Sequence, residues 1–148
     1  LGKTGLKVSM LGFGGIPIRE VSEKEAIAVV NRALDLGVNL VHTSHAGTGY
    51  GDSEHKIGQV MKERKDECFV AVKVSGRTRI EAEKELEVSL RALNVNHIEL
   101  AHLPVGAEAF SQVMGNGGAF EAFKKAQEDG VIDHIGITSH DPAFWLKP

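Results

Sequence analysis

Tyr50 and Lys73 are the two residues of this sequence whose types and positions most clearly indicate chemistry. Each lies at or just past the end of an apolar run that is typical of a β-strand. An ammonium near a phenol favours the phenolate and so makes the phenol a better proton donor. Two such groups at the C-terminal ends of parallel strands would form a catalytic mouth. The sequence therefore predicts a proton-donating pair at that end of a sheet.

Alternating strand and helix patterns must position this pair. Apolar runs predict strands over residues 9–15, 38–43, 68–74, 97–103 and 132–138. Two capping boxes, Ser22–Glu25 and Thr78–Glu81, predict the starts of two helices. The remaining helices are expected after Ser53 and over residues 119–128.

Strands that are apolar at nearly every position and alternate with helices predict a parallel sheet with both faces covered. A doubly wound sheet and a (β/α)8 TIM barrel both satisfy this α/β pattern. The barrel typically needs about 250 residues. The 148 residues would therefore supply an incomplete barrel, with an N-terminal hairpin over residues 1–8 and about five of the eight parallel strand-helix units. We expect a single domain over residues 1–148.

The composition argues against several classes of protein. Hydrophobic residues make up 42% and charged residues 25% of the chain, as in an ordinary globular protein. The net charge is -3 with no basic stripe, which argues against nucleic acid as a partner. No apolar run has the length of a membrane span. The single cysteine, Cys68, fits a reducing compartment, so a cytoplasmic protein is expected.

The sequence resembles the aldo/keto reductase family over nearly its whole length, with the matching segments in the family's order. These segments are residues 2–9, 11–15, 33–39, 50–54 (YGDSE), the strand that ends at Lys73, 89–93 and 130–137. Residues 117–119 and 135–140 look closest to a bacterial branch, some members of which carry an iron–sulfur segment further along.

The resemblance implies a barrel in which NAD(P)H passes a hydride to a small carbonyl compound, an aldehyde or a ketone. The family's chemistry uses an aspartate, a tyrosine that donates the proton, a lysine and a histidine. Tyr50 and Lys73 match the tyrosine and the lysine. The aspartate position falls on His42, and the histidine position falls on Pro104.

These two departures change the expected chemistry. A histidine at position 42 supplies no permanent anion, so Lys73 loses the carboxylate that would orient it. Pro104 has no side-chain donor for a carbonyl oxygen. His102 lies two residues earlier, on the same side of a regular strand and about 6–7 Å deeper. His102 is therefore a candidate replacement for the missing histidine, acting through a water.

The expected cofactor is NADPH or NADH, and the resemblance offers three residues to contact it. Gly12, Gly14 and Gly15 lack the G-x-G-x-x-G spacing and no helix opens directly on them. They indicate turn geometry or close backbone approach rather than phosphate binding. The resemblance places the strand end at Gly14 near the nicotinamide side. It also matches Thr138 and Ser139 with positions that hold the nicotinamide amide, although hydroxyls after a strand are common helix caps as well.

Two alternative functions remain open at this point. The chain is either catalytic or a truncated or degenerate relative without turnover, which associates with itself or with another chain through open barrel edges. A third function, a metal-dependent hydrolase, would require His42, His102 and His140 to converge on a metal. No H-x-H or H-E-x-x-H spacing supports such a site, and no metal is expected.

Overall fold

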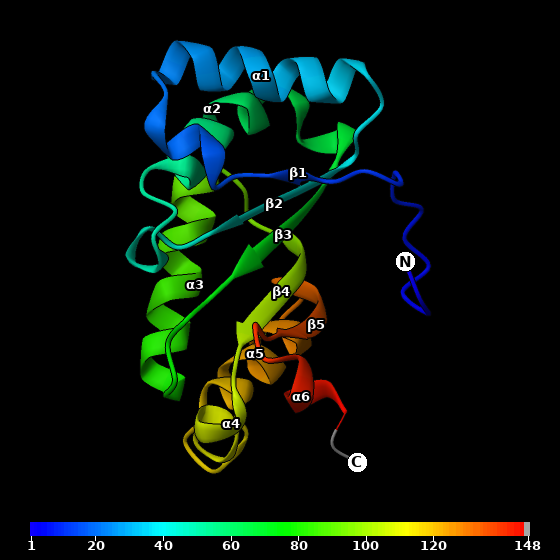
Figure 1. Ribbon diagram of the computed structural model, residues 1–148. Coiled ribbons are helices and arrows are strands. Elements are labelled where there is room, and N and C mark those ends of the chain that lie inside the picture. Colours follow the sequence, from blue (N-terminus) through cyan, green and yellow to red (C-terminus); the bar gives the residue numbers. More distant parts are fainter. Residues whose placement is uncertain (147–148) are drawn as a thin grey trace.

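The computed structural model describes residues 1–146 and contains one parallel sheet, with strands in the order β1-β2-β3-β4-β5 (Figure 1). The strands are β1 (Phe13–Gly14), β2 (Leu40–Ser44), β3 (Phe69–Lys73), β4 (Ile98–Pro104) and β5 (Ile132–Thr138). Each strand pairs with the next one along the chain, without the reversal of order that defines a doubly wound sheet. The predicted incomplete barrel is therefore confirmed. Residues 147–148 of the expected domain lie outside the described residues.

Helices follow the strands along the chain, and those between the strands cover one face of the sheet (Figure 1). They are α1 (Glu23–Asp35), α2 (Ser53–Arg64), α3 (Arg79–Leu93), α4 (Ala107–Met114), α5 (Ala119–Glu128) and α6 (Pro142–Trp145), with short 3-10 helices at Pro17–Glu20, Ala46–Thr48 and Lys65–Glu67. Both predicted capping boxes form. Over residues 1–146, no helix combines the length and the apolar character needed to cross a bilayer.

The N-terminal segment differs from the sequence prediction. Residues 1–8 form no hairpin: they contain a turn closed by the Thr4 N–H and the Leu1 carbonyl (3.1 Å) and no strand. The chain is held instead by a side chain, because the Ser9 N–H donates to the Asn39 amide oxygen at 2.6 Å. The glycines and polar residues of this segment favour a turn, but the flanking residues do not pair as strands. The predicted hairpin is therefore wrong.

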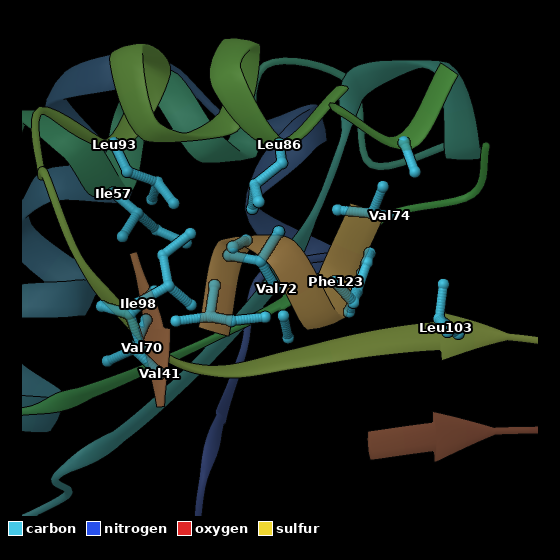
Figure 2. Packing of buried hydrophobic residues seen from close by; sticks show 14 of the residues in the cluster. Val41, Ile57, Val70, Val72, Val74, Leu86, Leu93, Ile98, Leu103 and Phe123 are labelled. Carbon is cyan, nitrogen blue, oxygen red and sulfur yellow. The ribbon is translucent and has the colours of Figure 1, made fainter. Parts of the chain in front are cut away.

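The hydrophobic core lies between the sheet and its helices. Figure 2 shows Val70, Val72 and Val74 of the β3 region on the same side as Leu86 and Leu93 of α3. The three valines have no exposed area. Burying each such side chain stabilises the fold by about 1.5–3 kcal/mol. Because strand side chains alternate, the residues between these valines point to the opposite face.

Helices α2 and α3 approach each other closely at Gly58. A Cβ atom at this position would lie 2.1 Å from the Ala92 carbonyl oxygen and 2.9 Å from the Leu93 Cα. The Asn94 amide also donates to the Gly58 carbonyl at 3.0 Å. The absence of a side chain at Gly58 therefore sets the distance between the two helices.

Candidate active site

The register of the sheet places Lys73 and His102 side by side. Lys73 pairs with Ser44 of β2 on one side and with His102 of β4 on the other, and His102 pairs in turn with Gly136 of β5. Paired residues of neighbouring strands point to the same face. The ammonium and the imidazole therefore share the face opposite the helices. His42 lies on this face too, since it alternates with the core residues of β2.

Tyr50 reaches the same end of the sheet from the loop after β2. Gly49 (φ 86°) and Gly51 (φ 56°) flank it in the left-handed region, which glycine adopts at low cost. Tyr50 is 8% exposed, and the Lys73 Nζ atom lies 4.7 Å from the centroid of its ring. This is a cation–π contact. The two side chains that the sequence placed at neighbouring strand ends are therefore in contact in the structure.

Two imidazoles complete the cluster around Tyr50. The His42 ring centroid lies 5.9 Å from that of Tyr50 and 6.1 Å from that of His102. Burial lowers the pKa of His42 to about 4, helped by the charges of Lys73 and His102. Burial and the Lys73 ammonium also lower the pKa of His102. Both rings are therefore neutral near pH 7, and each carries one N–H donor.

The His102 ring packs against the backbone of Gly136, where a side chain would leave no room for it. A Cβ atom at position 136 would lie 2.3 Å from His102 Cδ2 and 2.9 Å from its Nε2. The ring therefore covers the backbone of β5, and its Nδ1 atom is buried without a hydrogen-bond partner among the described residues. Pro104 is exposed at the end of β4. The only imidazole on β4 is therefore that of His102, which lies deeper in the sheet than Pro104 and next to Lys73.

The residues proposed for cofactor contact are divided between the two edges of the sheet. Thr138 and Ser139 line a cavity of about 440 Å³ beyond the ends of β4 and β5. Gly14 ends β1, in register with His42, and belongs to the opposite edge. His140 lines the same cavity as Ser139. In residues 1–146 no three histidine, cysteine or carboxylate side chains are grouped so as to hold a metal ion.

A buried lysine that sequence reasoning missed anchors the segment next to the Tyr50 loop. Lys56 of α2 is 3% exposed and donates to the carbonyls of Ile18 (3.0 Å), Arg19 (3.2 Å) and Val21 (2.8 Å). The Arg19 guanidinium donates in turn to the Gly49 carbonyl at 2.5 Å, directly before Tyr50 in the chain. These contacts join distant parts of the sequence, so no local spacing could reveal them.

A buried carboxyl, Glu54, lies in the first turn of α2, four positions after Tyr50. It is 4% exposed, and its Oε1 atom and the Ser89 hydroxyl are both buried without a hydrogen-bond partner among the described residues. Burial, with a contribution from the nearby Glu85 carboxylate, raises the pKa of Glu54 to about 7. The carboxyl is thus close to half-protonated at neutral pH.

We expect Glu54 to make the folded state less stable as the pH rises. Its pKa increases from 4.5 in the unfolded chain to about 7 in the folded one, so the folded state holds the proton more tightly between these values. The free energy of unfolding then falls by up to about 3 kcal/mol between pH 4.5 and pH 8 on account of this group. Glu54→Gln should remove this loss, as measured by urea denaturation across that range.

The matched control for this prediction is Glu63→Gln, an exposed carboxylate on the same helix. Its difference from the wild type should stay constant with pH. The comparison with Glu54→Gln isolates Glu54 from the buried histidines, which change stability in the opposite direction over part of the range. A constant difference for Glu54→Gln as well would contradict the assignment.

Comparison with known proteins matches the chain to one protein family. The sequence pattern of the Aldo/keto reductase family matches residues 10–144. L-galactose dehydrogenase of Arabidopsis thaliana is 32% identical over 155 aligned residues, which cover 93% of this chain and 47% of that enzyme.

Solved structures agree with the sequence comparison. An aldo-keto reductase from Bacillus halodurans in its holo form has a TM-score of 0.79 and 27% identity, covering 96% of this chain and 50% of that one. An aldo-keto reductase from Klebsiella pneumoniae, solved in complex with NADPH, has a TM-score of 0.77 and 20% identity over 95% of this chain and 50% of that one. The chain spans about half the length of the relatives it matches.

Proposed function

This chain belongs to the aldo/keto reductase family, and from that premise we propose that it takes part in the NAD(P)H-dependent reduction of an aldehyde or a ketone. The observation that carries the proposal is the contact between the Lys73 ammonium and the Tyr50 ring. A phenol held against a cation, with neutral imidazoles beside it, is suited to donate a proton to a carbonyl oxygen.

Each side chain of the cluster has a role in this reaction. When bound, NADPH or NADH would supply the hydride that the carbonyl carbon accepts. The electron pair of the C=O bond moves to oxygen, and that oxygen takes the proton of the Tyr50 hydroxyl. Lys73 stabilises the phenolate that remains. An N–H of His42 or His102 donates a hydrogen bond to the same oxygen as its negative charge develops.

The cavity beyond the ends of β4 and β5 suits the nicotinamide end of the cofactor. The Thr138 and Ser139 side chains that line it offer hydroxyl donors and acceptors. A carboxamide, with one acceptor and two donors, is the matching group. NADPH is the first candidate because the Klebsiella pneumoniae relative was solved with it, and NADH is the alternative. Gly14 would approach the cofactor only through its backbone.

Transfer of deuterium tests the proposal directly. The protein is incubated with an aldehyde and with NADPH or NADH in which both hydrogens on the reactive carbon of the nicotinamide are deuterium, and the alcohol is analysed by mass spectrometry. We expect one deuterium in each product molecule, with consumption of the cofactor that depends on the carbonyl compound. An alcohol without deuterium, or cofactor loss that is independent of the aldehyde, would contradict the proposal.

A non-catalytic partial barrel is the second candidate, and three observations favour it. Lys73 has no carboxylate partner in residues 1–146, and Pro104 offers no donor. The strands β1 and β5 each pair on one side only among the described residues. The unpaired edges favour association with another copy or another chain. Absence of deuterium transfer together with a stable oligomer would support this candidate over the first.

A further inference from the structure

Lys73 differs from the other shielded lysines of the chain in having no carboxylate partner. Three lysines in residues 1–146 are buried or half-buried: Lys56, Lys65 and Lys73. The first pairs with Asp52 at 2.7 Å and the second with Glu99 at 2.6 Å. Lys73 makes no ion pair within the described residues, and its ammonium lies over the face of the Tyr50 ring. Removing an ammonium from water without a counter-charge is costly, so this position favours an anion.

The groups around Lys73 are donors rather than counter-ions. His42 and His102 are neutral and half-buried, and the one charge that acts on both of them is the Lys73 ammonium. The His102 Nδ1 atom is shielded from water and has no partner in the part of the chain that the structure describes. Tyr50 adds a hydroxyl. The local charge is therefore positive, and several hydrogen-bond donors surround it.

We propose that Lys73 and His42 bind a carboxylate that is carried by the carbonyl substrate, next to the proton donor Tyr50. The inference rests on the proposed reductase function and names its substrate class as α-oxo acids. In such acids the carboxylate and the carbonyl group are on adjacent carbons. The Lys73 Nζ atom lies 4.7 Å from the centroid of the Tyr50 ring, so the two side chains are close enough to contact one such ligand. Lys73 would hold the carboxylate while Tyr50 faces the carbonyl oxygen.

The histidine at position 42 is what makes this site available. A carboxylate at position 42 would form an ion pair with the Lys73 ammonium and neutralise its charge. A neutral imidazole leaves the full charge of Lys73 for a ligand and adds a donor of its own. The same substitution that weakens the resemblance to a standard reductase site therefore creates a binding site for an anion.

Calorimetric titration without cofactor tests the site independently of turnover. The ligands are pyruvate, its uncharged methyl ester, and inorganic phosphate as a free anion. We expect the protein to bind pyruvate about 10–100-fold more tightly than methyl pyruvate, the size of one charge-assisted contact. Phosphate should bind more weakly than pyruvate. Equal binding of pyruvate and its ester would overturn the proposal, and phosphate binding as tight as that of pyruvate would overturn the assignment to a substrate carboxylate.

Two variants identify the residues involved. Lys73→Met should abolish the preference for pyruvate over its ester, whereas Lys24→Met, at an exposed lysine on α1, should keep it. His42→Asp supplies the missing carboxylate and keeps the lysine, so it tests the site even if Lys73→Met does not fold. We expect it to lower pyruvate affinity at least tenfold. Unchanged affinity in folded His42→Asp would overturn the proposal.

The outcome separates this inference from the function on which it rests. Tight pyruvate binding without deuterium transfer to any carbonyl compound would leave the anion site in place and remove the reductase function. Equal reduction of pyruvate and methyl pyruvate, with deuterium transfer, would leave the reductase function in place and remove the anion site.

Discussion

Tyr50→Phe should lower the rate of carbonyl reduction by about 10²–10⁴-fold, the usual contribution of a positioned general acid. Phenylalanine keeps the ring that contacts Lys73 and adjoins His42. It removes only the hydroxyl, and with it the proton that the carbonyl oxygen needs. Because the ring is 8% exposed and well packed, the fold should be retained. The measurement is kcat for carbonyl-dependent NADPH oxidation, compared with the wild type at saturating cofactor.

Controls separate the lost proton from a lost structure. Circular dichroism and thermal unfolding should be unchanged in Tyr50→Phe. Ser111→Ala removes a hydroxyl from the exposed surface of α4 and should keep the wild-type rate. A folded Tyr50→Phe variant that turns over as fast as the wild type would remove Tyr50 from its assigned role.

Gly58→Ala should destabilise the protein by about 3 kcal/mol, at the upper end of the usual cost of overpacking. The added Cβ would meet the Ala92 carbonyl oxygen at 2.1 Å and the Leu93 Cα at 2.9 Å. Both atoms belong to the backbone, so neither can rotate away as a side chain can. Helices α2 and α3 would have to separate. Alanine favours the helix over glycine by about 1 kcal/mol, which offsets only part of this cost.

Urea denaturation measures this effect, and Gly14→Ala is its matched control. Gly14 lies in a strand where an added Cβ would meet no atom within 4 Å. Its free energy of unfolding should change little. If Gly58→Ala unfolded at the same urea concentration as the wild type, the close contact between α2 and α3 would not limit stability.

The sequence was most informative where structure is determined locally. The capping boxes at Ser22 and Thr78 form as predicted, and the predicted bounds of α5 and β5 match the structure. These elements depend on contacts between residues three or four apart, or on an apolar run. Helix α4 was missed because its N-cap residue, Gly106, offers no side-chain cap and the helix has only eight residues.

The candidate site was predicted in part, for the same physical reason. Tyr50 and Lys73 end or follow apolar runs, so the topology of a parallel sheet brings them to one end. The burial of Glu54 could not be predicted, because an acidic residue in the first turn of a helix is usually exposed to solvent. It lies where α2 packs against α3, near the Glu85 carboxylate of that helix. Lys56 presents the same problem, since its three carbonyl partners lie more than 30 positions away.

The bare backbone at Gly136 under the imidazole of His102 constrains how the two positions can change together. Any side chain at 136 would occupy the volume of the ring, 2.3 Å from one of its atoms. Substitutions at positions 102 and 136 can therefore accumulate in one order only. Position 102 must first give up its ring, and only then can position 136 gain a side chain. Change at one position is therefore coupled to change at the other through the space that the ring occupies.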